Sequence, residues 1–118
     1  MPKGAEDLPG EILESATGLL VDLCTMSSAS GDHEGIRQVA SRVAAELARR
    51  GLSAEVGTES DEDNKPQPVL IACGPKAGEH YLLLVGHMDT VLDAAPPRIE
   101  YDRLIATGPL DMKGGLAM

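Results

Sequence analysis

Apolar residues in the first half of the chain recur at intervals of three and four, which is the period of an amphipathic helix. One such stretch covers residues 12–24, and a second covers residues 36–47 and ends at Gly51, a residue suited to the end of a helix. A run rich in serine and glycine, residues 27–31, interrupts the pattern between them. The sequence therefore predicts two helices joined by a short polar connection.

After Gly51 the pattern changes to short apolar runs bounded by turn residues, which is typical of strands. The strands predicted in this way cover residues 53–56, 69–73 and 81–85, followed by a hairpin over residues 99–106 that turns at Asp102 and Arg103. The run from Leu82 to Val85 is apolar at every position, so we expect a central strand that helices cover on both faces.

The remaining segments complete the predicted fold. Residues 58–68 are acidic and contain no large apolar residue before Pro68, so we expect a surface loop there. A third helix is expected to begin at Met112. These elements predict an α/β fold with about four to five strands in a sheet flanked by helices.

Composition and charge narrow the possible functions. The 118 residues suffice for one domain or part of one, and the net charge of -9 argues against binding to nucleic acid or to anionic membranes. The core must be aliphatic, because Tyr81 and Tyr101 are the only aromatic residues. Cys24 and Cys73 lie far apart without a metal-binding spacing, so we expect both to be core residues of a cytoplasmic protein.

A first candidate site follows the predicted central strand, at residues 86–90. Ligands of α/β sheets bind at the carboxyl ends of strands, so polar residues at this place suit a site. His87 and Asp89 are two residues apart, and in extended backbone their side chains point to the same side. His87 could then be a metal ligand that Asp89 orients, or both could be ligands; an ordinary surface histidine is the simpler alternative.

A second candidate is Asp111, which lies between apolar neighbours just before the expected third helix. Its carboxylate could bridge two divalent cations, or it could cap the helix that follows. His33, His80 and Lys113 are predicted to be surface residues without a role in the site.

The two segments together, GHMDTV (86–91) and GPLDMKGGLAM (108–118), resemble the co-catalytic zinc exopeptidases and amidohydrolases. This family includes glutamate carboxypeptidase, acetylornithine deacetylase, succinyl-diaminopimelate desuccinylase and aminoacylase. The hairpin over residues 98–103 looks most like the glutamate carboxypeptidase branch, and residues 26–31 are similar to the usual opening of the family. The resemblance extends from about residue 12 to residue 118.

This resemblance implies a zinc-dependent hydrolase of peptide or N-acyl amide bonds, with the fold of a zinc-exopeptidase-like sheet. It implies that His87 is a ligand of one zinc ion, that Asp111 bridges two, and that Asp89 is a catalytic residue that orients His87. Cobalt or manganese could substitute for zinc. The substrate would be a small peptide or an N-acyl amino acid, attacked by a water molecule that the metal activates.

In the family, further metal ligands, the general base and a lid domain that usually forms the dimer lie downstream of these segments. We therefore expect residues 1–118 to be an incomplete N-terminal portion of the metal-binding catalytic domain, inactive on its own. The full-length protein would be a homodimer through the missing domain. Two alternatives remain: a non-catalytic regulatory or binding module that keeps the fold, and a gene product without function.

Overall fold

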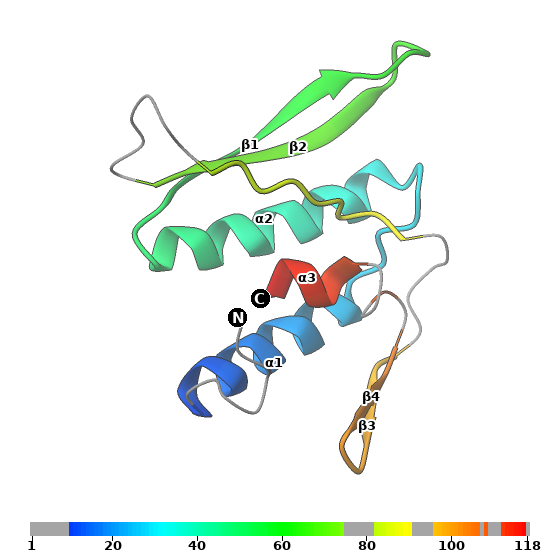
Figure 1. Cartoon of the computed structure of the whole chain (residues 1–118). Coiled ribbons are helices and arrows are strands. Elements are labelled where there is room, and N and C mark those ends of the chain that lie inside the picture. Colours follow the sequence, from blue (N-terminus) through cyan, green and yellow to red (C-terminus); the bar gives the residue numbers. More distant parts are fainter. Residues whose placement is uncertain (1–9, 75–81, 91–95, 107, 109–111, 118) are drawn as a thin grey trace.

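The computed structural model describes residues 10–74, 82–90, 96–106, 108 and 112–117. It is a mixed α/β structure (Figure 1). The helices are α1 (Gly10–Thr25), α2 (His33–Arg49) and α3 (Gly114–Ala117), and the strands are β1 (Ser53–Ser60), β2 (Pro66–Cys73), β3 (Arg98–Glu100) and β4 (Arg103–Ile105). None of the described helices is long and apolar enough to cross a membrane.

Both predicted N-terminal helices are confirmed, and local chemistry sets their limits. Asp32 caps the start of α2, where its carboxylate accepts a hydrogen bond from the amide of Gly35 at 3.0 Å. A Cβ atom at Gly35 would overlap the carbonyl oxygen of Ser27, so only glycine allows this close approach of the connection to the helix. Gly51 follows α2 with a φ of +84°, the left-handed conformation expected after a helix end.

The core lies between α1 and α2 and is aliphatic, as predicted. Its centre consists of Leu19 and Leu23 from α1 and Val39 and Val43 from α2. The partly buried side chains that pack against this centre come from every layer of the molecule: Met26, Leu47, Leu70, Met88, Leu116 and Ala117. Met88 belongs to the first candidate segment, residues 86–90, and Leu116 belongs to the second, residues 108–118. Both candidate segments therefore pack against the core.

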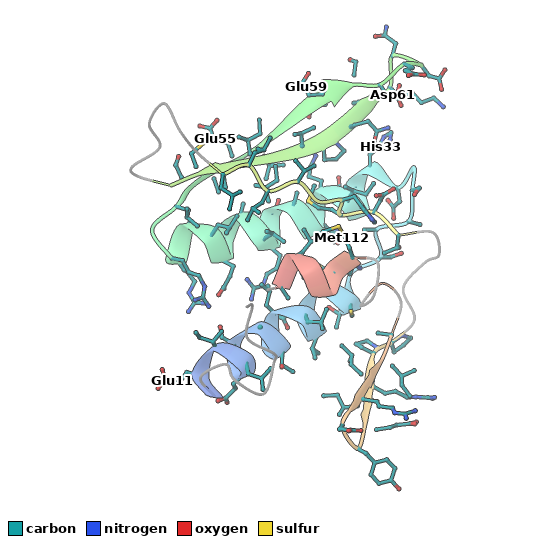
Figure 2. The ribbon with its side chains drawn as sticks, viewed as in Figure 1. Glu11, His33, Glu55, Glu59, Asp61 and Met112 are labelled. Carbon is teal, nitrogen blue, oxygen red and sulfur yellow. The ribbon has the colours of Figure 1, made fainter. Side chains whose placement is uncertain are left out.

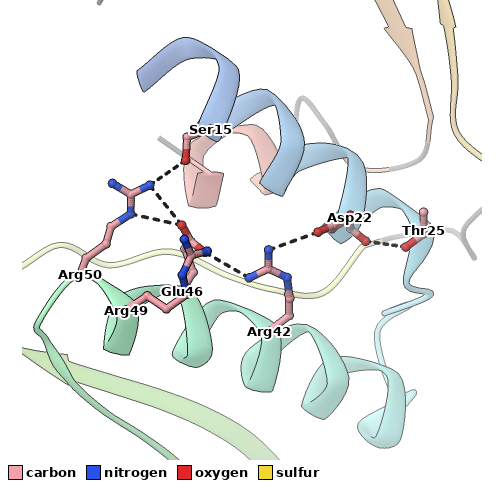
Figure 3. A network of polar contacts seen from close by, with 7 residues as sticks. All are labelled: Ser15, Asp22, Thr25, Arg42, Glu46, Arg49 and Arg50. Carbon is pink, nitrogen blue, oxygen red and sulfur yellow. Dashed lines mark hydrogen bonds and ion pairs between the residues drawn. The ribbon is translucent and has the colours of Figure 1, made fainter. Parts of the chain in front are cut away.

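A polar network joins α1 to α2 beside the core (Figure 3). Glu46, buried on α2, receives ion pairs from Arg42, Arg49 and Arg50 at 3.0 to 3.4 Å. Arg42 also reaches Asp22 on α1 at 3.2 Å. Burial alone would raise the pKa of Glu46, but hydrogen bonds from Arg50 and Arg42 outweigh it and hold that pKa below its ordinary value of 4.5.

The prediction of a surface loop over residues 58–68 is wrong for most of these residues, because they belong to β1 and β2. β1 and β2 form a long antiparallel hairpin with Ser53 opposite Cys73 and Ser60 opposite Pro66, so that residues 61–65 alone make the turn. The side chain of Asp61 closes this turn by accepting hydrogen bonds from the amides of Asp63 and Lys65. Polar residues here occupy an exposed hairpin end rather than a loop (Figure 2).

The run Leu82 to Val85 and the thiol of Cys73 are exposed, although both were expected to be buried. Leu82 to Val85 form no strand, and each of these four side chains is at least 72% exposed, whereas we expected a buried central strand. A strand is held by hydrogen bonds to a neighbour, and within the described residues the only pairing near this segment is a single bridge between Ala29 and Thr90. Cys73 was expected in the core but is exposed at the end of β2, while Cys24 is buried as predicted.

The predicted C-terminal hairpin is confirmed as β3–β4, although it turns at Tyr101 and Asp102, one residue earlier than expected. The described strands form two separate two-stranded antiparallel sheets rather than one sheet. The β1–β2 hairpin packs along α2, and α3 packs on α1, so α2 lies between the hairpin and the other two helices (Figure 1). Residues 82–90 run along this central region, and β3–β4 projects away from it (Figure 1).

Candidate functional site

The segment that follows the exposed apolar run is clamped to the connection between α1 and α2. The Ser28 hydroxyl donates to the carbonyl of Met88 at 2.8 Å, and the Thr90 amide donates to the carbonyl of Ser28 at 2.8 Å. The amide of Ser30 in turn donates to the carbonyl of Thr90 at 2.8 Å. Ser28 and Thr90 are both buried, so the bonds between these two residues are shielded from water. The bonds to Met88 and Thr90 fix Asp89, which lies between them, and His87 directly precedes this stretch.

His87 and Asp89 contact each other as their spacing predicts. His87 Nδ1 lies 3.0 Å from the main-chain oxygen of Asp89 and 3.2 Å from its Oδ1 atom. Both of these oxygens are acceptors, so the arrangement requires a proton on Nδ1. The two side chains are 47% and 40% exposed, which leaves the pair accessible to a ligand.

A third side chain joins this pair from the serine-rich connection. Ser30 Oγ donates to Asp89 Oδ2 at 2.6 Å, on the opposite carboxylate oxygen from the one that faces His87. The three side chains therefore form a chain of polar contacts from Ser30 through Asp89 to His87.

The second candidate segment lies directly against the first. The amide of His87 donates to the sulfur of Met112 at 3.4 Å, and a Cβ atom at Gly86 would come within 2.6 Å of the Met112 methyl group. The third helix was expected to begin at Met112, but α3 begins at Gly114, and Met112 lies two residues before it, beside Gly86 and His87 (Figure 2). Gly108 has a φ of +94°, and a Cβ atom there would lie 2.8 Å from the Thr90 methyl group.

Lys113 differs from its prediction as a surface residue. It is 1% exposed, and its amine donates to the carbonyl of Met26 at 2.8 Å, just beyond the end of α1. Burial lowers the pKa of the Lys113 ammonium, an effect that the electrostatic interaction with the nearby Cys24 side chain partly opposes. The amine thus ties the second segment to the same connection that clamps the first.

The predicted site residues are therefore partly accounted for. The described residues bring His87 and Asp89 together, and the His87 amide contacts Met112, the residue after Asp111. Asp111 itself lies outside the described residues, as do His80 and most of the segment between Thr90 and Pro97.

A divalent metal needs more ligands than this. Within the described part of the chain, no group of three or more histidine, cysteine or acidic residues could hold a metal ion. The chemistry of the pair nevertheless suits one: a histidine whose Nδ1 is held by a carboxylate presents Nε2 as the ligating atom, an arrangement common around protein-bound zinc. His87 and Asp89 thus fit part of a metal site.

Sequence reasoning missed three residues that build this region: Ser28, Ser30 and Lys113. The sequence indicated the serines as the break between two helices and as part of the stretch similar to the opening of the family, but not as contacts of the site, because a hydrogen bond to a residue about 60 positions away leaves no periodic signal. For Lys113, a buried lysine is rare enough that a surface position is the natural expectation.

Comparison of the chain with protein-family models, with curated proteins and with solved structures gave no significant match in any of the three.

Proposed function

We propose that this chain is the N-terminal, metal-binding portion of a dinuclear zinc hydrolase that cleaves peptide or N-acyl amide bonds. One observation carries the proposal: the segments around His87 and Asp111, about two dozen residues apart, pack together through the contact between the His87 amide and Met112. Carboxylate and imidazole groups that converge from separate segments are what a metal site needs.

In this proposal His87 would hold one zinc ion through Nε2, and the Asp111 carboxylate would be shared by the two ions. Asp89 holds the proton of His87 on Nδ1 and so keeps the other nitrogen directed at the metal. Zinc, or cobalt or manganese in its place, would lower the pKa of a bound water molecule and polarise the substrate carbonyl. Ser28 and Thr90, through their paired main-chain bonds, keep this segment in position.

The proposal extends to the whole protein. Two ligands are too few for a stable dinuclear site, so the other ligands, the general base and the lid domain would come from further sequence of the zinc-exopeptidase type. The complete protein would be a cytoplasmic homodimer that acts on small peptides or N-acyl amino acids. The isolated chain would be inactive and would bind zinc no tighter than the micromolar range.

The deciding experiment begins with the coding sequence beyond codon 118. An open reading frame that continues with a paired Glu-Glu and a late histidine supports the proposal. In the encoded protein, Asp111→Ala should then abolish hydrolysis of an N-acyl amino acid and change the thermal midpoint only by the lost metal stabilisation.

Asp102→Ala is the matched control, because it removes an exposed carboxylate from the turn between β3 and β4. This variant should keep its activity. Activity of Asp111→Ala within about tenfold of the parent would contradict the bridging role, since loss of a bridging ligand disrupts both ions. For the isolated chain, hydrolysis or zinc affinity tighter than micromolar in a homogeneous sample would contradict the proposal that it is incomplete.

A second candidate function is a non-catalytic binding module. The exposure of Leu82 to Val85 favours it, because contiguous exposed apolar side chains commonly mark an interaction surface. A stop codon directly after codon 118 would favour this candidate over the hydrolase.

A further inference from the structure

The connection between α1 and α2 contributes a side chain to the candidate site that no sequence pattern assigned to it. Ser30 lies at the end of this connection, and its hydroxyl is 2.6 Å from Asp89 Oδ2. From the geometry we infer that Ser30 is a positioning residue: it orients the Asp89 carboxylate and, through it, the imidazole ring of His87.

The two oxygens of the Asp89 carboxylate face different partners. Oδ1 lies 3.2 Å from His87 Nδ1, while Oδ2 accepts the hydroxyl proton of Ser30. An exposed aspartate side chain would otherwise rotate between several staggered conformations. A hydrogen bond to one carboxylate oxygen removes that freedom, so the other oxygen stays directed at the histidine.

Ser30 has one hydroxyl proton and two acceptors within reach. The main-chain oxygen of Thr90 lies 3.3 Å from Ser30 Oγ, which is longer by 0.7 Å than the contact with Asp89. Hydrogen bonds from a hydroxyl to an ionised carboxylate are short and strong, and the 2.6 Å contact falls in that range. The hydroxyl proton therefore belongs to the bond with Asp89.

The backbone keeps this arrangement in register. The Ser30 amide donates to the Thr90 carbonyl, and the Thr90 amide donates to the Ser28 carbonyl, so both main-chain bonds are made at Thr90, directly after Asp89. The Ser28 hydroxyl holds the carbonyl of Met88, directly before Asp89. Because the backbone of Ser30 is fixed relative to that of Asp89, its hydroxyl reaches the carboxylate without the loss of freedom that a mobile side chain would incur.

Two consequences follow for His87. The ring holds its proton on Nδ1, facing Asp89, and Nε2 is the nitrogen that would ligate a zinc ion. The first consequence needs no metal. The second, which gives Ser30 its functional meaning, rests on the proposed zinc site.

The test measures the tautomer of the His87 ring by nitrogen NMR in the 118-residue chain at about pH 9, where histidine side chains are neutral. In the wild-type chain the form protonated on Nδ1 should predominate. In Ser30→Ala its share should fall, but not as far as the mixture of both tautomers that a free imidazole side chain adopts, because the main-chain oxygen of Asp89 still lies 3.0 Å from Nδ1. Ser30→Thr, which keeps the hydroxyl, should retain the wild-type ratio.

Thr25→Ala is the matched control. Thr25 stands at the end of α1, and its hydroxyl donates to the carbonyl of Asp22 instead of to the site. This variant should leave the His87 tautomer unchanged. An unchanged ratio in Ser30→Ala, an equal change in Thr25→Ala, or a wild-type ring protonated mainly on Nε2 would each overturn the inference.

A second measurement separates this inference from the proposed function. If the zinc site exists, Ser30→Ala should weaken zinc binding by about tenfold, the lower end of the effect expected for groups that orient a ligand. If the tautomer responds as expected but neither the chain nor its extended form binds zinc, the proposed function fails and the positioning role of Ser30 stands.

Discussion

The surroundings of Lys113 determine both the position of its side chain and the pKa of its ammonium group. Its aliphatic stem packs beside Gly108, and its amine is buried against the end of α1 with the carbonyl of Met26 as its hydrogen-bond acceptor. Carbonyl groups at the end of a helix carry partial negative charge, which favours a cation at this place. Desolvation opposes this and lowers the pKa of the ammonium group.

The lowered pKa of Lys113 makes stability depend on pH with a definite sign. The unfolded chain holds the Lys113 proton up to about pH 10.5, whereas the folded chain releases it at lower pH. Within that window a rise in pH favours the folded state, at about 1.4 kcal/mol for each unit by which the pKa is lowered. The free energy of unfolding should therefore rise with pH in the wild-type chain relative to Lys113→Met, as measured by urea denaturation.

The comparison of Lys113→Met with the wild type isolates the titration of the Lys113 amine for two reasons. Burial raises the pKa of the Cys24 thiol, which has the opposite effect on stability above pH 9.0, but Cys24 is present in both proteins. Lys65→Met, which removes an exposed lysine in the turn between β1 and β2, should show the wild-type pH dependence. A parallel pH dependence in Lys113→Met and the wild type would show that the buried amine does not titrate in this way.

For single residues, the sequence correctly predicted the contact between His87 and Asp89, but it wrongly predicted that Lys113 lies at the surface. The spacing of His87 and Asp89 was sufficient, because extended backbone places side chains two residues apart on one side. The roles of Ser30 and Lys113 depend on main-chain and side-chain partners 59 and 87 positions away. No local pattern encodes such partners.

At the scale of elements, the contribution of the Glu46 ion-pair network beside α1 and α2 to stability can be tested by substitution. The Glu46 carboxylate is stabilised in its ionised form by three arginines, although its burial acts in the other direction. A carboxylate with a lowered pKa contributes stability that is present above about pH 4.5 and is lost as the pH falls through the lowered value. Glu46→Gln should therefore lower the thermal midpoint at pH 7, and the difference from wild type should shrink in acid.

The control for this experiment is Glu55→Gln, which changes an exposed glutamate on β1. It should leave the thermal midpoint close to that of the wild type at every pH, because exposed charges contribute little. If Glu46→Gln and Glu55→Gln gave the same acid profile, the arginine cluster would not be a source of stability.

The helices were predictable because α1 and α2 bury one face each, which imposes the helical period on the sequence. The β1–β2 hairpin was underestimated because its outer end lies away from the core, where strands can be polar on both faces. Pro66 and Pro68 also argue against a strand, yet their two-residue spacing directs both nitrogens to the same edge of β2. The hydrogen-bonding groups toward β1 thus remain intact.

For the whole molecule, the main unusual property is the exposed apolar run. Leu82, Leu84 and Val85 are each more than 80% exposed in a chain with a net charge of -9. Such a surface binds apolar dyes and lowers solubility. Leu84→Lys should reduce the fluorescence of a bound naphthalene sulfonate dye and should change the thermal midpoint little, because the side chain makes few packing contacts.

Ile71→Lys provides the comparison, since Ile71 is also exposed, at 62%, but lies on β2 apart from the run. Its effect on dye fluorescence should be smaller than that of Leu84→Lys. Equal effects of the two substitutions would mean that the dye does not recognise residues 82–85 as a surface.

The clamp around the α1–α2 connection also determines when the site can form. The bonds from Ser28 to Met88 and from Lys113 to Met26 close loops of 60 and 87 residues, and both are long in a chain of 118 residues. Contacts between residues so distant in sequence form late, because the entropy lost on closing the loop precedes any gain. As the chain leaves the ribosome, α1 and α2 can form early, while His87 and Asp89 reach their final positions only after Lys113 has been synthesised.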